Sequence, residues 1–239
     1  MKLIINITLV FLLISNSFGQ GKNHVITYGV TSKTKNFSKK LKTKKEKQFK
    51  NQLNNFFNSN KVVDFKLICS NTEAVFFMVD KIKKGNAKKS LVEIILGKNY
   101  FYSNLNKQIV LNRKETLGEF FIIKHKLFNW TITNEEKKIG KYYCKKATGI
   151  KKVINDKGVF NHKVEAWFTT EMPINFAPDN YRGLPGLIIE LNDNKFNYKV
   201  KKIELNKEVY KIKKPTKGKK ITYEELNEIY KEMAHNMRS

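Results

Sequence analysis

The sequence predicts an α+β protein that is mainly β, built on a strongly curved, half-barrel-like antiparallel sheet of about eight to ten strands. Short apolar runs with period-two alternation follow one another from Val63 to Leu205, separated by Gly, Asn and Lys turns. Their close spacing favours an antiparallel meander over βαβ units. Helical stripes lie before and after these runs, so we expect an N-terminal and a C-terminal helix. The N-terminal helix is expected to cover an apolar concave face of the sheet.

The first nineteen residues have the pattern of a secretory signal peptide. Lys2 precedes an apolar stretch from Leu3 to Ile14, and Ser17-x-Gly19 fits the small-x-small rule for cleavage before Gln20. That stretch is too short to span a bilayer of about 30 Å, and no later stretch approaches the roughly 18 apolar residues of a spanning helix. We therefore expect an exported protein that is periplasmic, envelope-associated or secreted. Residues 20–239 are expected to form a single β-rich domain without a transmembrane helix.

The elements of this domain follow in order. A first strand is expected at His24–Thr31, and a helix over residues 38–58, where Leu41, Lys45, Phe49 and Leu53 recur at helical steps. Further strands are expected at Val63–Cys69, Glu73–Asp80, Leu91–Leu96, Asn99–Ser103, Gln108–Asn112, Gly118–Lys126, Asn129–Thr133, Lys141–Lys152, Phe160–Thr170, Leu187–Asn192 and Phe196–Leu205.

The C-terminal helix has a clear start signal. Thr222 followed by Glu225 forms a capping box, in which each side chain satisfies a backbone N–H that the first helical turn leaves unpaired. Leu226, Ile229, Tyr230, Met233 and Met237 then form one apolar stripe, which we expect to pack on the sheet or close one end of it.

The formal net charge of +26 comes almost entirely from lysine, because only Arg113, Arg182 and Arg238 are arginines among 47 basic residues. A nucleic-acid binder is expected to use more arginine, whose guanidinium group recognises guanine and phosphate with two hydrogen bonds. The composition therefore argues against nucleic acid as a partner and favours a solvated basic surface. Binding of a polyanion or an anionic surface through the dense Lys33–Lys50 segment stays open as an alternative.

Established catalytic motifs are absent from the sequence, and nothing indicates a cofactor or a metal site. Cys144 with His162 is a candidate nucleophile–base pair, and Glu165 with Glu171 a candidate carboxylate pair. A hydrolase-type enzyme with such dispersed residues remains an alternative, although we expect no enzyme activity. Cys69 and Cys144 could form a disulfide in an oxidising compartment or remain separate core residues.

The segment from Glu171 to Gly186 contains three of the four prolines and is longer than an ordinary hairpin loop. Pro185-Gly186 can occupy the centre of a type II turn, with Gly at positive φ. One interpretation is a rigid connector that positions the following strand. The other is a binding edge for a ligand or partner, formed by Trp167, Tyr181 and Arg182.

Several motifs resemble one known family. Gly183, Leu184, Pro185, Gly186, Leu187 and Ile188 form the hexapeptide GLPGLI, and it is preceded by Trp130-Thr131-Ile132, by residues 138–148 (KIGKYYCKKAT) and by Ala166-Trp167-Phe168-Thr169. The chain therefore resembles the GLPGLI family of exported bacterial proteins. That resemblance implies an exported β-rich protein but no established catalytic or binding residues. The order of motifs is also similar to the half-barrel folds of periplasmic lipoprotein carriers, which is an analogy of fold only.

Taken together, these patterns predict an exported, non-enzymatic envelope protein. Its expected partner is an apolar, lipid-like ligand or an outer-membrane protein.

Overall fold

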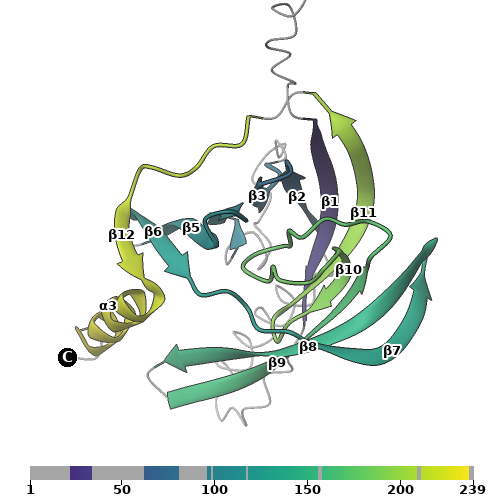
Figure 1. Cartoon of the computed structure of the whole chain (residues 1–239). Helices are drawn as coiled ribbons and strands as arrows, with labels where there is room; N and C mark the ends of the chain where they lie inside the picture. The colour runs from purple at the N-terminus through teal and green to yellow at the C-terminus, as the bar shows by residue number, and fades with distance from the viewer. Residues whose placement is uncertain are drawn as a thin grey trace, which may run out of the picture.

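A computed structural model describes residues 22–33, 62–80, 96–97, 99–116, 118–155, 158–208 and 211–236. Most of these residues belong to one open, curved, twelve-stranded sheet (Figure 1). The strands are β1 (Asn23–Ser32), β2 (Val63–Cys69), β3 (Glu73–Met78), β4 (Asn99–Asn104), β5 (Ile109–Thr116), β6 (Glu119–His125), β7 (Thr131–Ile139), β8 (Tyr142–Asn155), β9 (Gly158–Thr169), β10 (Leu187–Asn192), β11 (Phe196–Lys207) and β12 (Lys219–Thr222). One helix follows, α3 (Tyr223–Asn236).

The strand order is β12-β6-β5-β4-β3-β2-β1-β11-β10-β9-β8-β7. Two antiparallel meanders, β2 to β6 and β7 to β11, are therefore joined through β1, which pairs with both β2 and β11. β12 is added parallel to β6 at one edge. Because β7 and β12 end the order without pairing to each other, the sheet stays open as a bowl.

The predicted α+β class was wrong, because the described residues form a mainly β protein with α3 as its one full helix. The sheet has twelve strands, more than expected. The predicted N-terminal helix over residues 38–58 lies outside the described residues, as do the signal peptide and most of the Leu91–Leu96 strand. Two of the other predicted strands, Val63–Cys69 and Leu187–Asn192, have the predicted bounds, and the rest are present with shifted ends. β12 was missed.

The central strand β1 is buried on both faces. Ile26, Tyr28 and Val30 point into the main core on the concave face, together with strand residues such as Phe65. Val25 lies on the opposite face in a smaller cluster formed by Val25, Ile68, Val75 and Tyr102, against which Ile212 packs. Apolar residues on alternate faces require a cover on both sides of the sheet.

The described segment that covers the concave face is the loop of residues 170–186, between β9 and β10, where a helix was expected. Its Ile174, Phe176, Tyr181 and Leu184 are buried in the main core cluster. Figure 1 shows this loop running inside the curve of the sheet. Four buried side chains give the loop enough apolar surface to serve as the inner layer of the domain.

Glycines close this loop, although not through the predicted type II turn. Gly183 has a φ of +129°, and Gly186 does not lie in the positive-φ region that the predicted turn requires. Gly186 is needed for a different reason: a Cβ there would lie 2.1 Å from the carbonyl oxygen of Thr169. The hexapeptide thus presses the end of the loop against its start, where Leu187 pairs with Thr169.

The capping box predicted for the C-terminal helix is confirmed. Thr222 N donates to Glu225 Oε2 at 2.6 Å, and Glu225 N donates to Thr222 Oγ1 at 3.1 Å. Leu226 of α3 packs with Phe121, Ile123 and Ile221 in a third apolar cluster. The helix therefore docks on the β6–β12 edge of the sheet.

His125 lies where this helix meets the sheet. Its ring centroid is 5.9 Å from that of Phe101 and 6.0 Å from that of Tyr223, and its Nε2 is buried without a hydrogen-bond partner. Burial, reinforced by the positive charge of Lys151 and opposed by Glu224, lowers the pKa of His125 to about 4. The imidazole is therefore neutral in the folded protein at neutral pH.

His125→Phe tests this burial through the pH dependence of stability. Because the pKa of His125 is about 4 when folded and about 6.5 when unfolded, the unfolded chain binds more protons between these pH values. The free energy of unfolding should then fall by about 3 kcal/mol as the pH drops from about 6.5 to about 4. Urea titrations across this range should show a smaller fall in the variant, whereas identical pH profiles would contradict the assignment.

Gly186→Ala tests the close approach of the two ends of the loop. A methyl group 2.1 Å from a backbone oxygen forces the backbone apart, so we expect a loss of at least about 2 kcal/mol of unfolding free energy. Gly140→Ala is the control, because its φ of +59° gives only conformational strain of about 1–2 kcal/mol and its Cβ meets nothing within 4 Å. Equal losses in urea denaturation would argue against the steric explanation.

Candidate functional site

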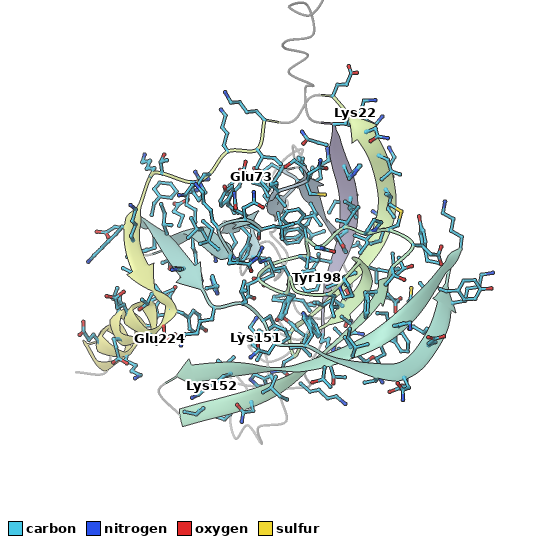
Figure 2. The ribbon with its side chains drawn as sticks, in the orientation of Figure 1. Lys22, Glu73, Lys151, Lys152, Tyr198 and Glu224 are labelled. Carbon is cyan, nitrogen blue, oxygen red and sulfur yellow. The ribbon has the colours of Figure 1, made fainter. Side chains whose placement is uncertain are left out.

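A buried polar cluster holds the loop of residues 170–186 against the sheet. The Tyr181 hydroxyl donates to Asp193 Oδ2 at 2.9 Å and accepts a hydrogen bond from Lys151 Nζ at 2.8 Å. Asp193 Oδ1 also accepts from the backbone N–H groups of Lys195 and Phe196, each at 2.6 Å. The Asp193 carboxylate is thus satisfied by donors from the loop and from the β10–β11 turn. Figure 2 places Lys151 and Tyr198 of this region near the middle of the molecule.

The electrostatics of this cluster favour structure over catalysis. Burial, followed by the nearby Asp193 and Asp179, raises the pKa of Tyr181 well above its ordinary value. Burial also raises the pKa of the neighbouring Tyr198, whose hydroxyl has no hydrogen-bond partner. Both phenols therefore stay protonated, and neither can act as a general base at neutral pH.

Arg182 anchors the same loop on the opposite side of the bowl. Arg182 is buried, with 4% of its surface exposed. It donates to the carbonyl oxygen of Asn104 at 3.2 Å and to Gln108 Oε1 at 3.1 Å. Arg182 therefore ties the loop to the turn between β4 and β5, and its burial lowers its pKa.

Trp167 lies on the other face of the sheet. In β9, Ala166 pairs with the core residue Leu191, whereas Trp167 pairs with Glu190 on the outer face. Lys137 Nζ lies 4.2 Å from the centroid of its ring. The structure thus brings Tyr181 and Arg182 together in one buried loop. Trp167 is also buried and belongs to the main core cluster, but it points to the opposite face of β9 from Ala166.

The candidate catalytic residues are also dispersed. His162 pairs with Lys151, seven positions along β8 from Cys144, which is a separation of roughly 23 Å at about 3.3 Å per residue. Burial and the nearby Glu171 raise the pKa of the Cys144 thiol to about 11. Glu165 is paired with Lys146, and Glu171 accepts a hydrogen bond from the backbone N–H of Tyr143. Neither the cysteine–histidine pair nor the carboxylate pair is assembled.

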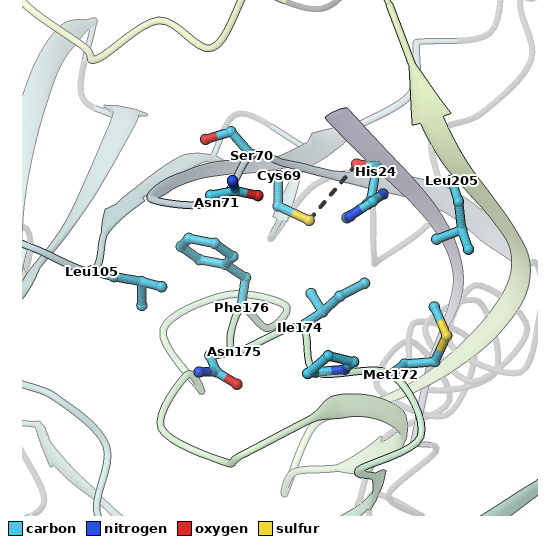
Figure 3. Close-up of a pocket in the computed structure, with 11 residues that line it drawn as sticks. His24, Cys69, Ser70, Asn71, Leu105, Met172, Ile174, Asn175, Phe176 and Leu205 are labelled. Atoms are coloured by element: carbon cyan, nitrogen blue, oxygen red, sulfur yellow. Dashed lines mark hydrogen bonds between the residues drawn. The ribbon is translucent and has the colours of Figure 1, made fainter. Parts of the chain in front are cut away.

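A pocket opens where the loop of residues 170–186 meets the rim of the sheet. It has a volume of about 440 Å³, within the usual range of ligand sites. Figure 3 shows Phe176 and Ile174 facing Cys69 and Leu205 across it. Its lining side chains are His24, Cys69, Ser70, Asn71, Leu105, Met172, Pro173, Ile174, Asn175, Phe176 and Leu205. We call it the rim pocket; among the residues that the structure describes, no Lys, Arg, Asp or Glu lines it.

The surroundings of Cys69 make its thiol in the rim pocket unreactive. Cys69 Sγ lies 3.8 Å from the carbonyl oxygen of His24, and burial raises the pKa of Cys69 to about 12. A thiol of this pKa is not a nucleophile at neutral pH. Cys69 and Cys144 are both free, so the disulfide considered from the sequence is not formed. In the described part of the chain, no group of three or more His, Cys, Asp or Glu side chains is placed to hold a metal ion.

Sequence reasoning missed Lys151, Asp193 and the apolar walls of the rim pocket. Asp193 had a usable signal, since an aspartate between two strands commonly accepts hydrogen bonds from backbone N–H groups that follow it in a turn. Lys151 had none, because it is one of many strand lysines. The Lys33–Lys50 segment lies outside the described residues except for Lys33.

The sequence matches one known protein family over part of its length. A family described as "Protein of unknown function (Porph_ging)" matches residues 155–190, which include all of β9, the loop, the hexapeptide and the first part of β10. The match indicates an uncharacterised family over this stretch, and its description does not name GLPGLI. No curated protein matches the sequence significantly.

Solved structures give a likeness of fold. PNGF-II has a TM-score of 0.51 at 13% identity, covering 87% of this chain and 32% of that chain. This chain therefore spans about a third of PNGF-II, and at this identity the likeness concerns the fold alone. LprF from Mycobacterium bovis has a TM-score of 0.29 at 11% identity, covering 83% of this chain and 91% of that chain. That score is too low to carry an argument.

Tyr181→Phe tests the polar cluster. It removes a donor from the buried carboxylate of Asp193, and hydrogen bonds to charged groups contribute about 1.5–3 kcal/mol. Tyr28→Phe is the matched control, because the Tyr28 hydroxyl donates to the neutral carbonyl of Ile188 and should cost about 0.5–1.5 kcal/mol. Urea denaturation of both variants should rank Tyr181→Phe as the more destabilised, and the reverse order would refute the role given to Asp193.

Proposed function

We propose that this chain is a non-enzymatic binding protein of the cell envelope and that the rim pocket binds an uncharged, mainly apolar ligand. The chemistry of the pocket walls carries this proposal. Leu105, Met172, Ile174, Phe176 and Leu205 supply the apolar surface, and desolvating such surface drives the binding of apolar molecules. A charged ligand group would lose its hydration here without an opposite charge to replace it.

The polar side chains of the pocket have a separate role. His24, Ser70, Asn71 and Asn175 lie among the apolar walls. A few polar groups in a mainly apolar site fix the orientation of a ligand. We therefore expect a ligand with a hydrocarbon body and one or two hydrogen-bonding groups, such as a hydroxyl or a carbonyl.

The absence of enzyme activity is part of the proposal and has structural support. The Cys69 thiol in the pocket has its pKa raised to about 12, and the Cys144–His162 pair is separated along β8. The phenol of Tyr181 remains protonated. Two lining residues could act as base and nucleophile, but they are bonded elsewhere: His24 Nδ1 accepts from the Asn206 N–H at 3.3 Å, and Ser70 Oγ donates to the carbonyl oxygen of Glu73 at 3.2 Å. Among the described residues, the rim pocket therefore holds no assembled nucleophile–base pair.

The envelope location is proposed from the signal-peptide pattern of residues 1–19. Within the described residues, no helix is long and apolar enough to cross a membrane.

Binding of Nile red, an uncharged apolar dye, tests the proposal. The full chain should bind about one equivalent, with an affinity that changes less than twofold between low salt and 1 M salt, because none of the described residues that line the pocket is a Lys, Arg, Asp or Glu. Leu205→Trp should weaken binding at least tenfold by filling the pocket with a larger ring. Fluorescence titration measures both effects.

Ile132→Trp is the matched control, because Ile132 is also a strand residue, is 49% exposed compared with 46% for Leu205, and does not line the pocket. It should bind the dye as the unmodified chain does. Equal binding by all three proteins, or hydrolysis of generic ester substrates that Leu205→Trp abolishes, would overturn the proposal.

A further inference from the structure

The outer face of the sheet has its own cover, a strap of residues 211–216 that leads from the end of β11 toward β12 (Figure 1). Ile212 packs on the outer cluster, and the Tyr100 hydroxyl donates to the carbonyl oxygen of Lys213 at 2.8 Å. Gly218 then lets the backbone approach β6, since a Cβ there would lie 2.9 Å from the carbonyl oxygen of Phe120. The strap is therefore fixed at both ends.

A groove of about 550 Å³ remains between the strap and the sheet. We call it the strap groove. Ile109 and Leu111 of β5 and Ile122 of β6 line it, with Ile221 at one end. Neighbouring strands lie about 4.8 Å apart, so a floor of two strands has about the width of one hydrocarbon chain. Two chains side by side would need a wider floor.

The charges around this apolar floor are mainly positive. Lys124, Lys214 and Lys220 line the groove, and in the described part of the chain none of the three is paired with a carboxylate. Glu225 is the single acidic residue of the lining, and its carboxylate accepts from Thr222 N at 2.6 Å and from Thr222 Oγ1 at 3.0 Å. Three lysines and one glutamate give the groove a net charge of +2 (3 − 1).

We propose that the strap groove binds a single-chain fatty-acid-type amphiphile, with its hydrocarbon chain along Ile109, Leu111 and Ile122 and its carboxylate at Lys124 and Lys214. The floor excludes water from the chain, and the lysines supply the charge that a carboxylate requires. This site shares no lining residue with the rim pocket, whose described lining contains no Lys, Arg, Asp or Glu.

The combination of floor and charge decides between occupants. A polyanion such as a nucleic acid or an acidic peptide uses the lysines but leaves the apolar floor unused. A neutral lipid uses the floor and leaves the lysines unused. A fatty-acid carboxylate matches both features, which is why we commit to it as the occupant.

Fluorescence titration with cis-parinaric acid, an 18-carbon polyene carboxylate, tests the proposal on the full chain. We expect saturable binding that palmitate displaces and that weakens at least threefold between low salt and 1 M salt. The double variant Lys124→Glu/Lys214→Glu should weaken binding at least tenfold. Lys152→Glu, at an exposed strand position outside the groove, should change it less than twofold.

Leu111→Glu tests the apolar floor of the strap groove separately from its lysines, and it should also weaken binding at least tenfold. Thermal unfolding of each variant identifies any that fails to fold. If the lysine double variant or Leu111→Glu fails to fold, the other of the two still tests the groove. Binding unchanged in both, or displacement by hexadecanol or a glutamate-rich peptide as strong as that by palmitate, would overturn the proposal. Loss of parinaric acid binding in Leu205→Trp alone would assign the ligand to the rim pocket, and would likewise overturn it.

Discussion

The buried carboxylate of Asp193 is the interaction on which the inner half of this structure depends. A carboxylate in a protein interior is tolerated only when its oxygens are satisfied by donors. Here one oxygen accepts from two backbone N–H groups of the β10–β11 turn, and the other accepts from the hydroxyl of Tyr181. That last bond fixes the loop of residues 170–186, because Tyr181 is its most deeply buried side chain. The loop residues that line the rim pocket are therefore held in place by the Asp193 carboxylate, which does not itself line the pocket.

Binding at the rim pocket should consequently respond to changes that do not touch it. Met172 and Ile174 lie near the start of the loop, and the Leu187 N–H donates to the carbonyl oxygen of Met172 at 2.9 Å. Tyr181 and Gly186 secure the remaining part of the same loop. A rigid loop loses less entropy when a ligand binds, because its side chains are already ordered. The segment can therefore be a rigid connector and also supply walls of the proposed pocket, although these walls are not the predicted binding residues Trp167, Tyr181 and Arg182.

Alternation in the sequence was enough to predict most strands, but not the covers of the sheet. β12 has a single apolar residue, Ile221, and pairs in parallel with a strand distant in the sequence, so no local pattern indicated it. The residues 170–186 were recognised as unusual, yet their burial depends on long-range contacts such as Arg182 with Asn104. Trp167 was grouped with Tyr181 because both lie near the hexapeptide, whereas strand alternation places it on the opposite face.

The two proposed sites differ in charge for the same physical reason. β1 is buried on both faces, so each face needs a covering segment, and each cover leaves a hollow beside it. On the concave side, charged groups such as Asp193 and Lys151 are bonded to protein partners, because an unpaired charge there would lose its hydration. On the outer side, the lysines of the strap groove remain solvated and need no partner. Among the described residues, the strap groove on the outer face therefore suits an anionic ligand, and the rim pocket suits an uncharged one.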